Sequence, residues 1–357
     1  MRIAQVTPRY YPNIGGVEKV VQKISEELVK KGHVVDVLTA DGSGKIIPES
    51  DFNGVTVIRF PPSGPFYHSS VLYKYLIQHG KNYDLVHAHS FHTLLPLLCA
   101  RAKEKDGFKL VLMGHYHGKG RIPFTNFFLQ AGRSWFARNY QKADLVLCLT
   151  EYEKKLLINH FKIIEPKIKI IPNGTAVDEI HVAVPFAKTG KILLNVSRLE
   201  KYKNIHLAIR AMPYLPEDYQ LVVIGEGPYR KQLKKLAINL GVNGRVKFTG
   251  RLSNEEIYRW YKTCDLVLNL SDLEAFGLTV IEGLAAGKPV LVNNRTALGE
   301  LARRFEGVTA VDARRVQPRE LAGAIVQRMG AWCQEADLDE YRWGGIVERL
   351  LNYYIGL

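Results

Sequence analysis

The stretch from Ser271 to Pro289, SDLEAFGLTVIEGLAAGKP, strongly constrains how the chain folds. The apolar run LVLNL before it is typical of a buried parallel strand. From about Leu278, apolar residues return at helical spacing, and Gly287 ends that pattern before a second apolar run. A loop between a buried parallel strand and a helix lies at the carboxyl edge of a doubly wound sheet, where such folds bind ligands. We therefore predict an α/β fold with a phosphate-binding turn at residues 271–277.

Two glutamates frame this turn. Glu274 lies in the loop, and Glu282 lies near the second turn of the predicted helix. An acid near a helix N-terminus is often a capping or dipole-stabilising residue, and Glu274 alone is compatible with that role. Glu282 stands among the small apolar residues of EGLAAG, and a carboxylate in such surroundings needs hydrogen-bond donors. Sugar or ribose hydroxyls are suitable donors, so both glutamates are candidate ligand-binding residues.

The length of 357 residues suits two domains of ordinary size. Alternating strand and helix patterns run through residues 1–182 and begin again after a stretch with little helix or strand signal. A similar eight-residue pattern occurs in both halves, ADLVLCLT at 143–150 and CDLVLNLS at 264–271. We predict two Rossmann-like domains, residues 1–182 and 190–340, with the segment 341–357 returning to the first domain.

The first βα turn ends in Gly15-Gly16, at the start of a predicted helix. Glycines there let a ligand approach the backbone closely, although a plain tight turn needs them too. The GxGxxG pattern of dinucleotide sites is absent, so a nicotinamide or flavin cofactor is not favoured. Gly16 is therefore a candidate residue of a phosphate pocket.

Four histidines, His87, His89, His115 and His117, lie at two predicted strand ends. They suggest zinc, but an H-x-H pair places two rings on one face of a strand without a required acidic or cysteine partner. His115, directly after its strand, is more typical of a site residue that faces a cleft. We predict no metal site and take His115 as a candidate catalytic residue.

Charged and glycine-rich loops follow two strands of the second half. Arg198 and Lys203 in SRLEKYKN can converge on one anionic group, although a charged surface loop is the alternative. Gly225, Glu226 and Gly227 occupy another strand end. With the 271–277 turn, three strand ends of one sheet would carry ligand-type residues, and this convergence favours a binding site.

The formal net charge of +14 predicts an anionic partner. Residues 107–143 hold six basic residues and no acidic one, interleaved with aromatic residues. This mixture fits nucleic acid, an anionic membrane surface or a phosphorylated acceptor, and the alternative is a solvated basic face over core aromatics. No nucleic-acid-binding motif is present, so nucleic acid is not favoured.

The four cysteines are far apart and show no metal-ligand spacing, so we expect reduced core residues. No apolar run approaches the roughly 20 residues that span a bilayer. The N-terminus shows no signal-peptide pattern. We expect a cytoplasmic protein, with peripheral attachment to the inner face of the cell membrane as an alternative.

Taken together, these motifs resemble the family-4 retaining glycosyltransferases of the GT-B fold. The resemblance covers nearly the whole chain, and the motifs occur in the family's order. They are GG at 15–16, HxH at 115–117, IPNG at 171–174, SRLEKYK at 197–203, GEGP at 225–228 and E-x-F-G-x4-E at 274–282. The resemblance implies two Rossmann-like domains facing each other across a cleft, with the donor bound by the second domain and the acceptor on the side of the first.

The resemblance also implies a role for each candidate residue. Arg198 and Lys203 would bind the donor diphosphate and stabilise it as it leaves. Glu274 would hold hydroxyls of the donor sugar, Glu282 would hold the ribose hydroxyls, and His115 would face the donor sugar. The other donor-binding candidates are Gly16, Gly225, Glu226, Gly227 and the backbone N–H groups of Phe276, Gly277 and Leu278.

The expected reaction is transfer of a hexose-type sugar from a UDP-, GDP- or ADP-sugar to an acceptor hydroxyl. Lipid-linked and phosphorylated acceptors both fit the basic aromatic segment. Fixed cations and helix dipoles can stabilise the leaving diphosphate, so we predict no metal and no cofactor. Metal-dependent enzymes of this kind carry Asp-x-Asp in a strand-end loop, whereas Asp337-Leu-Asp339 lies in a C-terminal acidic patch.

Retention is implied by the resemblance alone. The sequence offers no convincing carboxylate nucleophile, which favours a same-face mechanism in which the leaving phosphate takes the acceptor's proton. Thr296-Ala297 stands where such enzymes often carry Gly-Gly, which puts the local loop structure in doubt. A nucleotide-sugar epimerase on the same fold and a non-catalytic nucleotide-sugar-binding protein remain alternatives, whereas nothing points to the pyridoxal-binding lysine of a phosphorylase.

Overall fold

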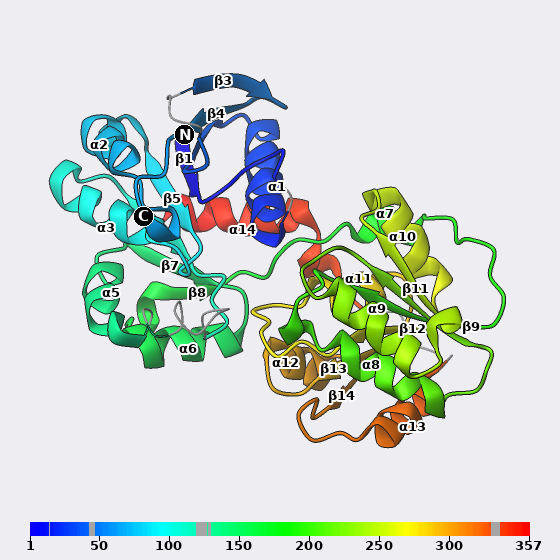
Figure 1. Cartoon of the computed structure of the whole chain (residues 1–357). Coiled ribbons are helices and arrows are strands. Elements are labelled where there is room, and N and C mark those ends of the chain that lie inside the picture. Colours follow the sequence, from blue (N-terminus) through cyan, green and yellow to red (C-terminus); the bar gives the residue numbers. More distant parts are fainter. Residues whose placement is uncertain (14, 43–46, 119–126, 128–129, 330–335) are drawn as a thin grey trace. The chain divides into compact units, whose positions relative to one another are not determined.

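A computed structural model describes residues 1–13, 15–42, 47–118, 127, 130–329 and 336–357. The chain forms two compact units (Figure 1). Unit 1 contains Met1–Gly174 and Trp343–Leu357, and unit 2 contains Thr175–Arg342. The division falls after Gly174, whereas the sequence pattern placed it between residues 182 and 190.

Unit 1 is built on an eight-stranded sheet with the order β3-β4-β2-β1-β5-β6-β7-β8. All neighbouring strands are parallel except β3 and β4, which pair antiparallel. The strands are β1 (Arg2–Thr7), β2 (Val34–Thr39), β3 (Ile47–Phe52), β4 (Val55–Arg59), β5 (Leu85–His89), β6 (Leu110–Met113), β7 (Leu145–Cys148) and β8 (Ile168–Ile170). The central strands β1, β5, β6 and β7 are almost wholly buried, as expected for a sheet covered on both faces.

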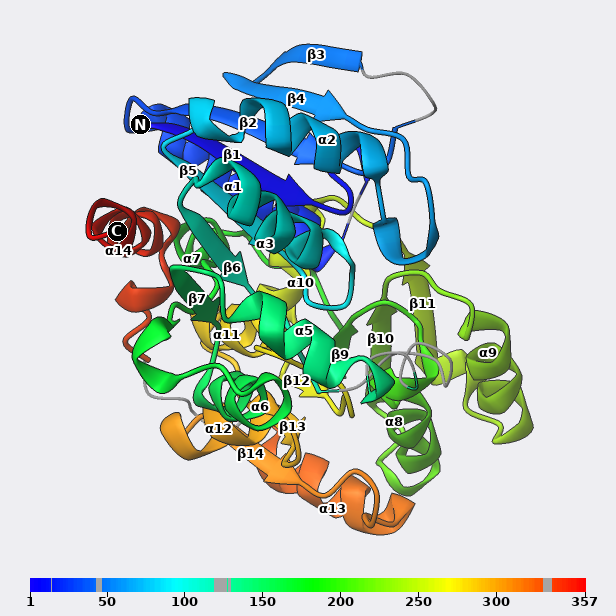
Figure 2. The same cartoon turned by 90° about the vertical axis from the view of Figure 1, so that its left-hand side faces the viewer.

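Helices cover both faces of this sheet (Figure 2). One face packs into a single apolar core with α2 (Ser70–His79), α3 (Leu95–Asp106), α5 (Arg133–Tyr140) and α6 (Glu151–Phe161). Sequence signals set these helix ends: Ser69 and Thr150 cap α2 and α6 through their hydroxyls, and Gly107 ends α3 in a left-handed conformation.

The last helix, α14 (Trp343–Ile355), packs against α1 (Gly16–Lys30) in unit 1, as the blue and red helices of Figure 1 show. Its first residue, Trp343, packs closely against Gly174, where a Cβ atom would lie 2.3 Å from the Trp343 ring. The buried Tyr354 near the end of α14 reaches His87 on β5. The predicted return of the C-terminal helix to the first domain is therefore confirmed.

Unit 2 is built on a six-stranded parallel sheet with the order β11-β10-β9-β12-β13-β14. The strands are β9 (Lys191–Val196), β10 (Tyr219–Ile224), β11 (Val246–Gly250), β12 (Leu266–Asn269), β13 (Val290–Asn293) and β14 (Val308–Val311). The order changes direction between β9 and β12, so their carboxyl ends form the switch point at which doubly wound sheets bind ligands.

Two groups of helices cover the sheet of unit 2. The first, α8 (Ile205–Ala211), α9 (Arg230–Asn239) and α13 (Pro318–Arg328), shares one apolar core with the sheet. The second is α7 (Val177–His181), α10 (Asn254–Thr263), α11 (Leu278–Ala285) and α12 (Ala297–Arg304). Both units are thus Rossmann-like α/β domains, and the predicted fold class is confirmed.

The repeated sequence pattern has the same structural role in both units. The Asp144 carboxylate accepts a 2.7 Å hydrogen bond from the backbone N–H of Leu110 on the neighbouring strand. The Asp265 carboxylate accepts a 2.8 Å hydrogen bond from the N–H of Ile192 in the same way. Each aspartate therefore aligns the start of its strand with the strand beside it.

Cys99, Cys148 and Cys264 are buried in the core, as expected, and Cys333 lies outside the described residues. In the part of the chain that the structure describes, no helix is both long and apolar enough to cross a membrane.

Candidate functional site

The loops after β10, β9 and β12 lie side by side at the carboxyl edge of unit 2, because these strands are neighbours in the sheet. Backbone hydrogen bonds join the loops directly. The N–H of Leu199 donates to the carbonyl of Glu226 at 2.9 Å, and the N–H of Asp272 donates to the carbonyl of Tyr202 at 2.8 Å. The three strand ends that the sequence singled out are therefore brought together.

Lys203 and Glu274 form the central charged pair of this edge. Lys203 Nζ donates to Glu274 Oε2 at 2.7 Å, and the two side chains are only 16% and 21% exposed. Lys203 belongs to a short 3-10 turn after β9, and Asn204, in a left-handed conformation, directs the chain from that turn into α8. Partial burial weakens solvent screening, so this pair is electrostatically stronger than a fully exposed one.

Arg198 lies on the same loop as Lys203 and is much more exposed. Its Nη2 donates to the Tyr202 hydroxyl at 3.1 Å, and its Nη1 is 3.9 Å from Glu200. The side chain is 44% exposed, which leaves part of the planar guanidinium accessible. Such a group binds phosphate oxygens in a bidentate manner.

The two glycines after β10 have a packing role in the structure. Gly225 has a φ of +129°, and a Cβ atom there would lie 2.0 Å from the Ser197 carbonyl oxygen. A Cβ atom on Gly227 would lie 2.4 Å from the Leu199 carbonyl oxygen. Both positions must lack a side chain for the loops after β9 and β10 to approach each other. Their contact with a donor stays a prediction.

Glu226 lies between these glycines and faces a basic side chain. Its Oε1 is 3.3 Å from Nη1 of Arg230 in the first turn of α9. The carboxylate is about one third exposed, so it remains accessible to a ligand while the arginine limits its rotation. Its role in donor binding stays a prediction.

Helix α11 begins at the turn that the sequence analysis started from. Gly277, with a φ of +106°, precedes its first residue, and a Cβ atom there would lie 2.7 Å from the Leu298 side chain. Phe276 is 3% exposed and its ring lies 5.9 Å from that of Tyr341, so its side chain belongs to the packed interior, and contact of its backbone N–H with a donor stays a prediction. The first turn of α11, which starts at Leu278, contains no acidic side chain, and its positive dipole end suits an anion.

Glu282 has a protein partner that sequence reasoning missed. The hydroxyl of Tyr261 on α10 donates to Glu282 Oε2 at 2.7 Å. Tyr261 is fully buried, and burial together with the nearby Glu282 carboxylate raises its pKa well above the ordinary value. The amphipathic pattern of α10 could have placed Tyr261 in the core, but no sequence signal pairs it with Glu282.

In unit 1, His115 follows Gly114 directly at the end of β6 and has a φ of +48°. A non-glycine residue in this left-handed region is uncommon and often marks a functional position. Gly114 is required because a Cβ atom there would lie 2.4 Å from Oε1 of the buried Glu153. His115 is 8% exposed, and burial lowers its pKa to about 4, so the imidazole is neutral at physiological pH.

His115 Nε2 is 3.3 Å from Nδ1 of His89, which ends β5. The His87 and His89 rings are 4.1 Å apart and both are buried. Among the described residues, no group of three or more histidine, cysteine, aspartate or glutamate side chains is placed to hold a metal ion. Three of the four histidines that the sequence grouped, His87, His89 and His115, are therefore close together, whereas the His117 ring stacks on that of His92.

Gly16 is the first residue of α1, and Gly15 precedes it in an extended conformation. A Cβ atom on Gly16 would meet nothing within 4 Å, whereas one on Gly15 would lie 2.2 Å from the Glu18 carboxylate. Open space beside Gly16 is compatible with close approach of a ligand, and its role in a phosphate pocket stays a prediction.

The basic aromatic segment 107–143 is only partly described, because residues 119–126 and 128–129 lie outside the described residues. The aromatic side chains that the structure describes in this segment divide into two sets. Tyr116, Phe136 and Tyr140 are buried in the core of unit 1, whereas Phe127 is 71% and Trp135 is 43% exposed. The alternative that the aromatic residues belong to the core is therefore right for Tyr116, Phe136 and Tyr140, but not for Phe127 and Trp135.

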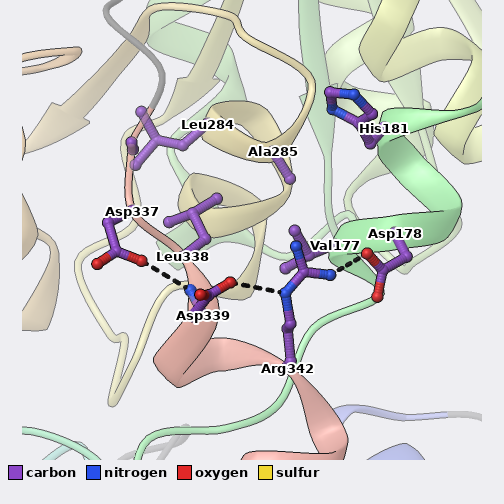
Figure 3. A pocket seen from close by; sticks show the side chains of 10 residues that line it. Val177, Asp178, His181, Leu284, Ala285, Asp337, Leu338, Asp339 and Arg342 are labelled. Atoms are coloured by element: carbon purple, nitrogen blue, oxygen red, sulfur yellow. Dashed lines mark hydrogen bonds and ion pairs between the residues drawn. The ribbon is translucent and has the colours of Figure 1, made fainter.

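Asp337 and Asp339 line a pocket of about 410 Å³ in unit 2, shown in Figure 3. Asp339 Oδ1 accepts a 2.9 Å bond from Arg342 Nε, and Arg342 also pairs with Asp178. Leu284 and Ala285, at the C-terminal end of α11, form part of the wall. This acidic pair therefore lies at the opposite end of α11 from the Glu274 loop.

Two family models match the chain. Residues 176–335 match the model described as glycosyl transferases group 1, and residues 14–179 match the model described as glycosyltransferase family 4. Together they cover nearly the whole chain, and their border lies close to the division between the two units.

The chain is similar to several known proteins. An uncharacterised glycosyltransferase of Methanocaldococcus jannaschii is 27% identical, with 99% of this chain and 98% of the relative covered. The alpha-monoglucosyldiacylglycerol synthase of Streptococcus pneumoniae is 27% identical over 84% of this chain and 73% of the relative. The structure of Anabaena HepE with UDP-glucose has a TM-score of 0.79 and 20% identity, with both chains fully covered.

Proposed function

Because the chain belongs to family 4 of the GT-B glycosyltransferases, we propose that it moves a hexose-type sugar from a nucleoside-diphosphate sugar to an acceptor hydroxyl, with retention of anomeric configuration and without a metal. The observation that carries this proposal is the pairing of Lys203 with Glu274 beside the accessible guanidinium of Arg198. At the switch point of the sheet, a cation can bind the phosphates of such a donor, and a neighbouring carboxylate can accept hydrogen bonds from its sugar hydroxyls.

The chemistry follows from the charges that develop as the sugar–phosphate bond breaks. Negative charge accumulates on the diphosphate, where Lys203, Arg198 and the N-terminus of α11 stabilise it. Glu274, held by Lys203, accepts hydrogen bonds from sugar hydroxyls, and its anionic charge favours the cationic character of the sugar. Because these groups are fixed before reaction, they need little reorganisation in the transition state.

The remaining donor contacts are assigned by their position. Glu282, held by Tyr261, accepts hydrogen bonds from the ribose hydroxyls. Gly225 and Gly227 bring the loop after β10 against the loop of Arg198, so that Glu226 and the backbone of this loop border the nucleotide. We assign no cofactor to this site. Retention follows a same-face path in which the leaving phosphate takes the acceptor's proton.

UDP-glucose is the first donor to test, because HepE was solved with it and has a similar fold. A lipid acceptor at an anionic membrane surface is the second part of the proposal. The S. pneumoniae relative is named for a diacylglycerol glycolipid, and the exposed Phe127 and Trp135 lie in a segment without acidic residues. The net charge of +14 would favour such a surface.

The test combines binding and turnover. Thermal-shift screening against UDP-, GDP- and ADP-sugars identifies the donor, since a ligand that binds the folded state raises Tm. The selected donor is then incubated with diacylglycerol in anionic and in neutral vesicles, and the product anomer is determined by NMR. An inverted product would contradict the retaining mechanism, and equal turnover in both vesicle types would contradict the membrane proposal. Formation of an epimer from donor alone would point to the epimerase instead.

A further inference from the structure

A line of buried polar side chains crosses the carboxyl ends of three neighbouring strands in unit 1. Gln5 lies on β1, His89 ends β5, and His115 follows β6. His89 Nε2 is 2.7 Å from Gln5 Oε1, and His89 Nδ1 is 3.3 Å from His115 Nε2. Gln5 and His89 are fully buried, and only His115 at the end of the line is partly exposed, by 8%.

The hydrogen-bonding capacity of these groups fixes where each proton lies. The amide oxygen of Gln5 can only accept, so His89 Nε2 must carry the hydrogen. His89 is neutral, because burial above all, and then the neighbouring His87 and His115, hold its pKa well below the ordinary value. A neutral imidazole has one N–H, so His89 Nδ1 is a lone-pair acceptor.

The same reasoning applies to the ring of His115. His115 Nε2 must donate to His89 Nδ1, because otherwise two lone pairs would face each other at 3.3 Å in a buried site. Burial keeps His115 neutral, so its other nitrogen, Nδ1, is left as an acceptor. Among the described residues no group bonds to His115 Nδ1, and it is not one of the fully buried polar atoms.

The surrounding structure holds this line in place. Gln5 is the register partner of His87 in the β1–β5 pair. The His87 ring packs at 4.1 Å from the His89 ring, and its Nδ1 is 2.6 Å from the Tyr354 hydroxyl on α14. The His89 ring is therefore restrained by packing as well as by its two hydrogen bonds.

We propose that Gln5 and His89 are positioning residues that fix His115 as the Nε2–H tautomer and present its Nδ1 lone pair to accept a hydrogen bond from a substrate hydroxyl. The substrate part of this inference rests on the proposed function, whereas the tautomer part rests on the hydrogen bonds and burial of these side chains in unit 1. Neither Gln5 nor His89 touches substrate in this scheme, and both act through His115.

The tautomer is measured by long-range 15N–1H NMR on the full-length protein labelled with 15N-histidine, without donor. The His115 signals are identified by their loss in His115→Gln. We expect a protonated Nε2 and an unprotonated Nδ1 for both His115 and His89. Gln5→Met keeps the side-chain length but removes the acceptor, so both rings should populate the two tautomers. Gln5→Glu, the matched control, keeps an acceptor oxygen and should keep the Nε2–H form of His115.

A proton on Nδ1 of His115 in the unaltered protein would overturn the inference, as would a folded Gln5→Met protein with an unchanged His115 spectrum. If Gln5→Met does not fold, the spectrum of the unaltered protein still decides. We expect Gln5→Met to lower kcat about tenfold, equivalent to about 1.4 kcal/mol. A shifted tautomer with unchanged kcat would overturn the substrate part. No turnover with any donor, combined with the expected spectrum, would count against the proposed function instead.

Discussion

Lys203 and Glu274 are 71 residues apart in sequence, and their charged atoms are 2.7 Å apart in the structure. They are carried by the loops after β9 and β12, the two strands between which the sheet order of unit 2 changes direction. The pair thus connects the two loops at the point where a doubly wound sheet binds its ligand. Removing either partner leaves a partly buried charge without its counter-ion, and the effect should appear in catalysis as well as in stability.

Lys203→Met should lower kcat about 100-fold, because one fixed cation at a developing negative charge contributes roughly 3 kcal/mol. Lys201→Met is the matched control, since Lys201 belongs to the same short turn but is exposed. Steady-state kinetics with the identified donor would measure both variants. Equal losses for the two lysines would indicate a general charge effect and contradict a specific role for Lys203.

Tyr261→Phe should raise the donor KM about fivefold and leave kcat nearly unchanged. The hydroxyl that is lost holds Glu282 in place, and one hydrogen bond to a charged group contributes about 1.5 kcal/mol or more, part of which the site recovers by relaxation. Tyr258→Phe is the control, because burial, and then the nearby Glu282, raises the pKa of Tyr258, but Tyr258 does not position the carboxylate in our scheme. A fall in kcat with unchanged KM would argue that Glu282 acts in the chemical step.

Much of this arrangement could be predicted because it depends on local pattern. The apolar run before Ser271, the helical spacing from Leu278 and the glycine at 277 specify strand, turn and helix through short-range preferences. The repeated Asp-Leu-Val-Leu pattern was visible for the same reason, and Asp144 and Asp265 have equivalent hydrogen bonds.

What could not be predicted depends on pairing between distant residues. Tyr261 and Glu282 lie on different helices, and Gln5 and His89 are 84 residues apart. Hydropathy places such side chains inside but does not show which partner satisfies them. The sequence suggested ligand contact for Gly225 and Gly227, which stays a prediction. It did not show the close approach of two loops that requires both glycines, because that is a feature of backbone geometry.

Gly225→Ala should destabilise the protein by about 2 to 4 kcal/mol, because a Cβ atom would lie 2.0 Å from a backbone oxygen and φ is +129°. Gly323→Ala is the control. This glycine lies within α13, and a Cβ atom there meets nothing within 4 Å, so alanine should stabilise by about 0.5 to 1 kcal/mol. Urea unfolding measures both. A Gly225→Ala protein as stable as the parent would show that the two loops can separate without cost.

The stability of the protein should fall as pH rises from about 5 to about 8, because of Glu153. This fully buried carboxyl accepts hydrogen bonds from the N–H groups of Tyr116 at 2.6 Å and Leu149 at 2.8 Å. Burial nevertheless dominates and raises its pKa to about 8. In this window the folded state keeps a proton that the unfolded state has released, so the free energy of unfolding decreases by on the order of 1 kcal/mol per pH unit. Above pH 8 both states are ionised, and this contribution levels off.

Urea unfolding at pH 5, 6, 7 and 8 would measure this slope, with Glu153→Gln as the variant that removes the titrating group. Glutamine keeps one acceptor oxygen for the two backbone donors, so some stability is lost at pH 5, where the glutamic acid is neutral in the folded protein. The free energy of unfolding of Glu153→Gln should change less with pH, because the contribution of Glu153 is missing. The free energies of unfolding of the two proteins should therefore become closer toward pH 8. Glu151→Gln, in the same helix turn, should keep the steep slope of the parent. Parallel pH profiles for the parent and Glu153→Gln would mean that Glu153 is already ionised in the folded protein at pH 5.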